Sequence, residues 1–131
     1  MTRRLQILLL ALLAAACATT ASRPPQSGFG DIPVPRGLTY QPGMSTVIES
    51  PAVKAAQLVY RGRLEPVSLA QAMRATLEAN GWRFASASSA PSLGTIQVYE
   101  KAGKTLQVRI RKGLWYTYLE LDTSRAEVAS R

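Results

Sequence analysis

The segment Lys104–Arg111 constrains the fold more than any other part of the chain, because apolar and polar residues alternate along it without a break. The apolar set is Leu106, Val108 and Ile110, and the polar set is Gln107, Arg109 and Arg111. A period of two predicts a β-strand with one face in the core and the other toward solvent. Ala102-Gly103 before it predicts a two-residue hairpin turn, and Lys112-Gly113 after it predicts a second turn.

Weaker versions of the same pattern predict four further strands, at residues 45–50, 53–61, 95–101 and 114–121, and residues 82–87, which leave the helix, are a candidate for one more. The small residues 86–92 predict a loop. We expect the core-facing side chains outside 104–111 to be Ala56, Leu58, Tyr60, Ile96, Val98, Trp115, Thr117, Leu119 and Leu121. The solvent-facing ones are then Gln97, Tyr99, Lys101, Tyr116, Tyr118 and Glu120.

One helix is predicted between the second and third strands. Ser68 and Gln71 have the spacing of a capping box, which predicts that the helix begins at Ser68. A stripe at helical spacing predicts the buried face: Leu69, Ala72, Met73, Thr76 and Leu77. Gly81 is predicted to end the helix in the left-handed conformation, with Trp82 folding back onto Leu77.

These elements predict an α+β domain in the order β-β-α-β-β-β. We expect a mostly antiparallel sheet of about five to six strands with one helix packed on one face. The domain is predicted to span residues 45–121, with a polar C-terminal tail at 122–131. Trp82 and Trp115 are both interpreted as core residues.

The N-terminus has the pattern of a secretory signal. Arg3 and Arg4 precede an apolar stretch that ends at Ala16, directly before Cys17, the one cysteine of the chain. About a dozen apolar residues cover about 18 Å as a helix, too little for a hydrocarbon core of about 30 Å. Residues 1–16 are therefore predicted to be a signal peptide. Residues 17–44, rich in proline and glycine, are predicted to be a tether, in which the extended run 31–37 is expected to lie along the domain.

With Ala14-Ala15-Ala16-Cys17 in the place of a lipobox, the chain resembles a bacterial lipoprotein precursor. That resemblance implies that Cys17 is acylated and becomes the first residue of the mature protein. The family prefers leucine where Ala14 stands, and Ala14-x-Ala16 also suits an ordinary signal peptidase, which would release a soluble protein. Within the lipoprotein interpretation, Ala18 implies delivery to the outer membrane.

Three short signatures add a second resemblance. DIPVP (Asp31–Pro35), LVYRG (Leu58–Gly62) and NGW (Asn80–Trp82) are similar to segments of small uncharacterised lipoproteins of proteobacteria. The similarity covers most of residues 31–121. Its motifs are an extended lead-in, a strand with its turn and a helix cap, so no catalytic residue is implied.

The side chains argue against an enzyme. The chain contains no histidine, and Cys17 is committed to the N-terminus. The usual general base, thiol nucleophile and nitrogen or sulfur metal ligands are therefore missing. No two carboxylates have a spacing that suggests a catalytic pair. We expect no catalytic residue, no metal site and no cofactor.

The charge of the chain suggests anionic partners. Sixteen Lys and Arg oppose eight Asp and Glu; loss of Arg3 and Arg4 with the signal peptide leaves a formal side-chain charge of +6. Outside the cytosol the available polyanions belong to the envelope, so we expect no nucleic-acid partner. Expected partners are the membrane, through the lipid anchor, and an envelope protein or anionic envelope polymer.

The solvent face of the sheet is the candidate binding surface. By alternation it gathers Tyr99, Lys101, Arg109, Arg111, Tyr116 and Tyr118. Aromatic rings interleaved with cations can stack on ligands and pair with phosphate or carboxylate. The competing interpretation is that these residues are ordinary cross-strand pairs of an exposed sheet.

The resulting hypothesis is a non-catalytic lipoprotein of the bacterial envelope. It would be anchored in the inner leaflet of the outer membrane, face the periplasm, and act as a binding or structural module. The alternative is a soluble periplasmic ligand-binding protein released by ordinary signal peptidase, with a pocket between helix and sheet.

Overall fold

The computed structural model describes residues 29–126. Cys17 and residues 127–131 lie outside this range, so the predicted signal peptide and lipidation site fall outside it too. The described elements follow in the order β1 Leu38–Tyr40, η2 Pro42–Met44, β2 Thr46–Glu49, β3 Val53–Gly62, α2 Pro66–Ala79, β4 Arg83–Ala90, β5 Gly94–Lys101, β6 Lys104–Lys112 and β7 Thr117–Ala126. Among these residues no helix has the length and apolar character needed to cross a membrane.

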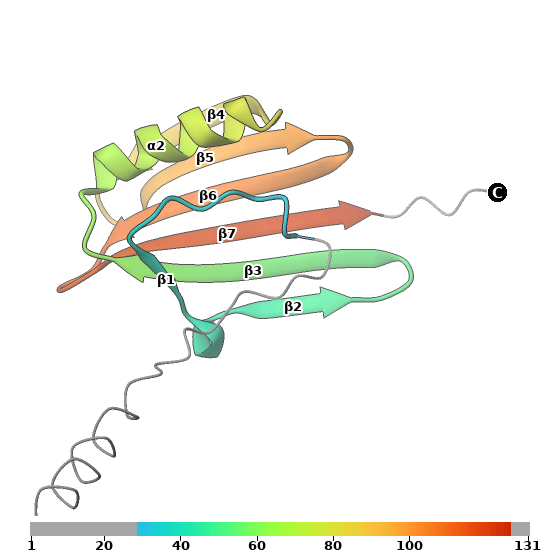
Figure 1. The fold of residues 1–131 in the computed structure, drawn as a ribbon, viewed down its shortest axis with the longest axis horizontal. Coiled ribbons are helices and arrows are strands. Elements are labelled where there is room, and N and C mark those ends of the chain that lie inside the picture. Colours follow the sequence, from blue (N-terminus) through green and yellow to red (C-terminus); the bar gives the residue numbers. More distant parts are fainter. Residues whose placement is uncertain (1–28, 127–131) are drawn as a thin grey trace, which may run out of the picture.

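All strands of the described residues join one antiparallel sheet (Figure 1). The strand order is β1-β3-β7-β6-β5-β4, and β2 pairs with β3 beside β1. Helix α2 crosses over the β4–β6 side of the sheet (Figure 1). The predicted class, α+β with a mostly antiparallel sheet and one helix on one face, is confirmed.

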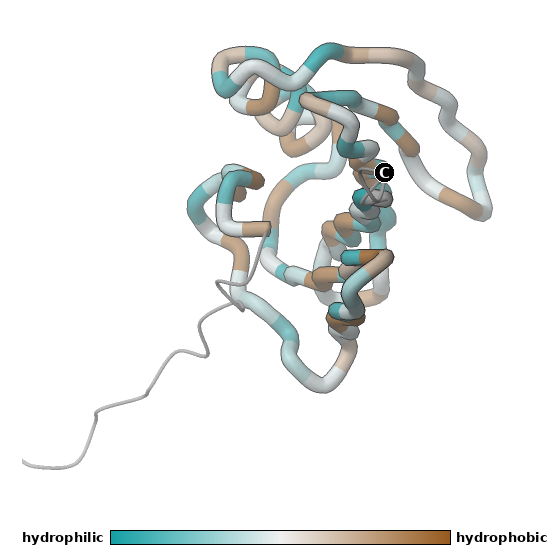
Figure 2. Tube along the Cα trace, turned by 90° about the vertical axis from the view of Figure 1, so that its right-hand side faces the viewer, coloured by the Kyte–Doolittle hydropathy of each residue, from teal (hydrophilic) through white to brown (hydrophobic). Residues whose placement is uncertain are grey.

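The core lies between the sheet and two covering elements on the same face. Helix α2 contributes Leu69, Ala70, Met73 and Leu77, and the N-terminal segment contributes Phe29 and Ile32. Figure 2 shows the N-terminal segment and the helix on one side of the sheet. The opposite face carries no covering layer of described residues and is called the open face below.

The helix ends as predicted, but its N-cap lies three residues earlier. Gly81 has a φ of 84°, and the Trp82 N–H donates to the Leu77 carbonyl at 3.0 Å, which is the Schellman geometry. The N-cap is Glu65, not Ser68: its carboxylate accepts hydrogen bonds from the Val67 and Ser68 N–H groups. These bonds hold the pKa of Glu65 below its ordinary value. Pro66 suits the first helical position because its missing N–H would have no partner there.

The buried helix face differs from the predicted stripe at two positions. Leu69, Met73 and Leu77 are buried as predicted, but Ala70 replaces Ala72, which is exposed. The earlier start of the helix does not change the helical spacing of these residues. Burial of Ala70 in place of Ala72 instead means that the buried face of the helix is rotated slightly from the predicted stripe.

Strand β5 has the opposite facing from the prediction. Gln97 and Tyr99 are buried toward the helix, whereas Ile96 and Val98 lie half-buried on the open face. The register explains the error: Tyr99 pairs with Leu106 and Gln97 with Val108, and residues paired across two strands share a face.

Both ends of the predicted domain need correction. Residues 29–44, predicted to belong to the tether, pack on the domain through Phe29 and Ile32 and add β1 to the sheet. The predicted loop 86–92 is mostly strand, because β4 continues to Ala90. Residues 122–126, predicted to be tail, extend β7 along the whole of β3.

Candidate functional site

The six residues of the predicted binding surface do not all lie on one side of the sheet. Tyr99 and Lys101 lie on the helix side, while Arg109, Arg111 and Tyr118 lie on the open face, with Tyr116 in the turn beside them. The structure therefore brings four of the six predicted residues together and removes two.

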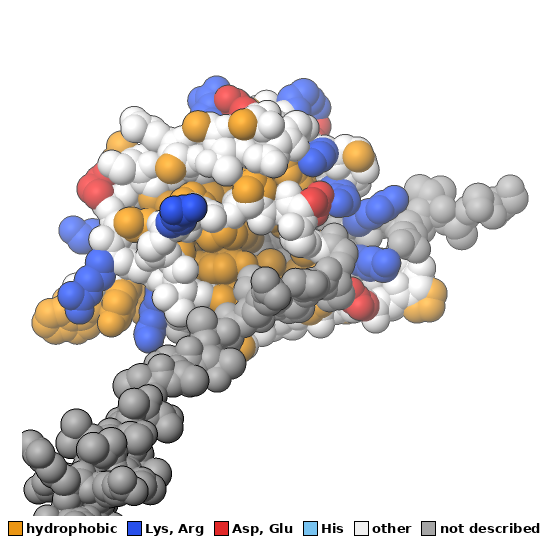
Figure 3. Space-filling model, in the orientation of Figure 1, with side chains coloured by type: hydrophobic (Ala, Val, Ile, Leu, Met, Phe, Trp, Pro, Cys, Tyr) orange, Lys and Arg blue, Asp and Glu red, His pale blue; other side chains and the backbone are white. Residues whose placement is uncertain are grey.

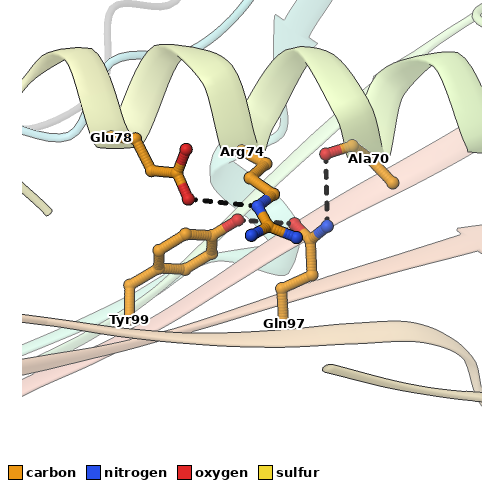
Figure 4. A network of polar contacts seen from close by, with 5 residues as sticks. All are labelled: Ala70, Arg74, Glu78, Gln97 and Tyr99. Carbon is orange, nitrogen blue, oxygen red and sulfur yellow. Dashed lines mark hydrogen bonds and ion pairs between the residues drawn. The ribbon is translucent and has the colours of Figure 1, made fainter. Parts of the chain in front are cut away.

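Tyr99 belongs to a buried polar network under the helix. Its hydroxyl donates to the Gln97 side-chain oxygen at 3.0 Å, and the Gln97 amide donates to the Ala70 carbonyl at 3.2 Å (Figure 4). Arg74 pairs with Glu78 across the top of this network. Burial raises the pKa of Tyr99 to about 12. Tyr99 is thus a neutral structural residue that joins β5 to the helix.

Lys101 has a structural role as well. Its ammonium group donates to the Asn80 carbonyl at 2.7 Å and lies 5.8 Å from the centre of the Trp82 ring. A cation at the C-terminal end of a helix is favoured by the helix dipole. Lys101 therefore helps to hold the end of α2 and is not part of the open face.

Arg109 and Arg111 are bound to one carboxylate on the open face. Arg109 donates to Glu120 at 3.1 Å and Arg111 donates to its other oxygen at 2.7 Å. The Glu120 side chain is only 10% exposed, whereas the two arginines are 33% and 41% exposed. Removing one arginine would leave a nearly buried charge less well paired, so both contribute to the sheet itself.

The cations best placed for a ligand lie at one end of the open face, where β3 ends and β6 turns into β7. Arg61 lies 4.8 Å and Arg63 lies 5.7 Å from the centre of the Tyr116 ring, and Arg111 lies 4.7 Å from that of Tyr118. We call these five residues the end cluster. Stacking fixes each guanidinium plane against a ring while its N–H groups stay available.

Arg61 and Arg63 differ from the other arginines of this face in their partners. Within residues 29–126 neither forms an ion pair with a carboxylate, and both are exposed. Their guanidinium groups can therefore bind a phosphate or carboxylate group without first breaking an ion pair. They are the functional candidates that the sequence-based prediction omitted, although Arg61 directly follows Tyr60, a predicted core-facing residue, so alternation puts Arg61 on the opposite face.

A hollow of about 480 Å³, lined by both apolar and polar side chains, lies at the other end of the open face. Its central row runs across three strands as Gln57, Asp122 and Gln107, which are paired in register. Burial raises the pKa of Asp122 and Glu120 adds to the rise, while Arg109 and the two glutamines oppose it. Amides and one carboxyl group can hydrogen-bond a neutral polar ligand, but the hollow contains no stacking ring.

The raised pKa of Asp122 predicts a pH dependence of stability. The folded state binds the proton of the Asp122 carboxyl group more tightly than the unfolded state does, so protonation of Asp122 favours folding in acid. That contribution falls as the pH rises from the ordinary pKa of the carboxyl group through its raised folded value. Asp122→Asn should remove this component of the stability-versus-pH curve, measured by urea unfolding between pH 3 and 7 (about the range spanned by ordinary and raised carboxyl pKa values). Parallel curves for the two proteins would contradict the assignment.

A metal site and a pocket under the helix are the two remaining kinds of candidate site within residues 29–126. No three His, Cys, Asp or Glu side chains within 29–126 come together as a metal site. The space between helix and sheet, where a ligand pocket was considered, is filled by Met73, Leu77 and Tyr99, whose side chains have no exposed surface.

Trp115 is not a core residue, contrary to the prediction. It is 76% exposed, and its neighbour Leu114 is 88% exposed. Both lie in a turn closed by a 2.7 Å hydrogen bond from the Gly113 N–H to the Tyr116 carbonyl, so β7 begins only at Thr117. The turn redirects the chain before Thr117, and the period of two does not extend back to Trp115.

Comparisons with known proteins leave the structure as the main guide to function. No family model, no curated protein and no solved structure matches this chain.

Proposed function

We propose that this protein is a lipid-anchored, non-catalytic module of the bacterial cell envelope, and that it binds an anionic envelope component through the end cluster. We infer the anchor from the Arg3–Cys17 signal pattern, in which Cys17 is the acylated first residue of the mature protein; Ala18 supports delivery to the outer membrane, with the domain facing the periplasm. The observation that carries the binding role is the pair Arg61 and Arg63, held on Tyr116 and free of carboxylate partners within the described residues.

The chemistry of the end cluster selects the class of ligand. Guanidinium groups bind phosphate and carboxylate through paired N–H donors, and stacking reduces the side-chain freedom lost on binding. Phospholipid headgroups, lipopolysaccharide and cell-wall polymers all carry such anions. Arg109 and Arg111 are poor positions for a test, because replacing them also leaves the nearly buried Glu120 carboxylate without its ion-pair partners.

The test is a charge reversal of the two free arginines, Arg61→Glu/Arg63→Glu. Each basic residue near an anionic lipid surface contributes about 1 kcal/mol, so loss of two should weaken binding to phosphatidylglycerol vesicles by roughly 25-fold or more. The assay compares sedimentation of the detergent-purified protein with these vesicles, with lipopolysaccharide and with cell-wall sacculi.

Arg125→Glu is the matched control, because Arg125 is an exposed arginine at the other end of β7. It changes the net charge in the same direction, by half as much, without touching the end cluster. Normal binding by the double variant to all three materials, or an equal loss per charge in the control, would refute a site at the end cluster.

A soluble ligand-binding protein remains the second candidate. The hollow around Gln57, Asp122 and Gln107 is the observation that favours it, since its amides could hold a small polar molecule. This role would need no anchor, so the mass of the mature protein separates the two candidates.

A further inference from the structure

The turn 113–116 places two large apolar side chains at the outermost tip of the β6–β7 hairpin. Leu114 and Trp115 are the most exposed large hydrophobic residues of the described chain. Scattered single apolar residues on a surface are ordinary. Two adjacent ones at a hairpin tip, one of them tryptophan, form a small apolar point.

Cations surround this point. Trp115 and Tyr116 line a hollow of about 330 Å³ together with Arg63 and Lys112, and Glu65 is the one carboxylate in its lining. Arg61 and Arg111 lie next to it in the end cluster. Figure 3 shows hydrophobic side chains projecting at the left-hand tip of the molecule with Lys and Arg side chains beside them, at the end where Figure 1 shows the start of β7.

We infer that the turn 113–116 is a membrane-contacting element for a bilayer that contains anionic phospholipid. Leu114 and Trp115 enter the interfacial region, while Arg61 and Arg63 pair with headgroup phosphates. Tryptophan favours this zone because its ring is apolar and its N–H can reach water or headgroups. The inference rests on the proposed function and names its anionic partner.

The size of the apolar point favours a bilayer over a protein partner. A stable protein interface buries about 800 Å² on each side around an apolar centre. Here two side chains project and the residues around them are charged. Shallow insertion flanked by basic residues is instead the pattern of interfacial membrane binding, in which apolar burial and attraction to anionic lipid act together.

The length of chain before the domain permits this contact. Phe29, the first described residue, lies twelve positions after Cys17, and a chain of this length can span at most about 40 Å. A domain of about 100 residues has a radius of gyration of about 13 Å. A lipid on Cys17 would therefore keep the whole domain within reach of the bilayer and raise the effective concentration of the turn at its surface.

The chain has two tryptophans, and their different exposure supplies the probe. Trp82 is 2% exposed, so acrylamide quenching of the full-length mature protein reports on Trp115, and Trp115→Phe supplies the background. The protein is mixed with vesicles of phosphatidylethanolamine and phosphatidylglycerol, or of phosphatidylcholine alone. Lipids with brominated chains then report whether Trp115 reaches the bilayer.

The expected result is a blue shift of Trp115 emission, protection from acrylamide and quenching by brominated lipid, all specific to the phosphatidylglycerol vesicles. The Arg61→Glu/Arg63→Glu protein should lose the response and the Arg125→Glu protein should keep it. Leu114→Asp should weaken it, whereas Leu93→Asp, at an exposed leucine of the β4–β5 turn, should not. High salt should also weaken it, because about 1 M salt reduces the Debye length to about 3 Å.

Three results would overturn the inference. They are an unchanged Trp115 spectrum on phosphatidylglycerol vesicles, an equal response on phosphatidylcholine, and a response only to lipopolysaccharide or a protein. In each case weakened binding of the double arginine variant to envelope material would still support the end cluster. Because vesicles are added from outside, the test of the turn does not depend on acylation of Cys17.

Discussion

Replacing Trp82 by alanine is expected to lower the free energy of unfolding by about 3–5 kcal/mol, the usual cost of deleting a buried aromatic side chain. Trp82 is 2% exposed and belongs to the core cluster formed by the sheet and helix α2. Its ring nitrogen has no hydrogen-bond partner among the described residues, so the loss comes from packing and from the contact of Lys101 with the ring rather than from a hydrogen bond. The cost is a large part of the 5–15 kcal/mol typical of a folded domain.

The matched control is Trp115→Ala, which deletes the same side chain at an exposed position. We expect its effect on unfolding to stay within about 0.5 kcal/mol, as for most surface substitutions. Urea unfolding followed by circular dichroism measures both variants without relying on tryptophan fluorescence. Similar losses for Trp82→Ala and Trp115→Ala would contradict the division of the two tryptophans between core and surface.

Gly94→Ala is expected to destabilise the protein by about 3 kcal/mol for two separable reasons. Gly94 has a φ of 75°, a conformation that costs an L-residue about 1–2 kcal/mol. A Cβ at this position would also lie 2.1 Å from the Ile110 carbonyl oxygen, so β5 and β6 would have to separate, which adds the cost of overpacking.

Gly103→Ala separates these two costs. Gly103 has nearly the same φ, 74°, but a Cβ there would meet nothing within 4 Å. This variant should lose only the conformational part, about 1 kcal/mol, again measured by urea unfolding. Equal losses for the two glycines would show that the close approach of Gly94 to β6 does not exist.

The fold class could be predicted because the strongest local patterns agree with the tertiary contacts. Leu106, Val108 and Ile110 are almost completely buried, and Gly81 ends the helix, both as predicted. The hairpin at Ala102-Gly103 was also predicted correctly, since Lys101 pairs with Lys104 across it. In these segments periodicity, capping and turn residues give the same answer.

The facing of β5 could have been predicted from the hairpin but not from hydrophobicity. A two-residue turn at 102–103 pairs Tyr99 with Leu106, and paired residues share a face. By hydrophobicity alone, Ile96 and Val98 are better core residues than Gln97 and Tyr99, because Gln97 and Tyr99 each have a polar end that disfavours burial. In the structure those ends bond to each other and to the helix backbone, which makes their burial acceptable.

The site was predicted only in part because it depends on cross-strand register at the end of the sheet. Alternation put Arg109, Arg111 and Tyr118 on the open face, but it could not show that Glu120 binds both arginines. Arg61 and Arg63 come from β3, far away in sequence, and meet Tyr116 only through the β3–β7 pairing. Local sequence carries no signal for that contact.

The intact mass of the mature protein purified from membranes tests whether this module is lipid-anchored. We expect a chain that begins at Cys17 and carries the added mass of two or three acyl chains, with the addition lost in Cys17→Ala. Two or three chains contribute about 0.8 kcal/mol per buried CH₂, enough for stable attachment. A mature chain that begins at Cys17 with the mass of the unmodified polypeptide and a free thiol would contradict the account and leave the soluble alternative.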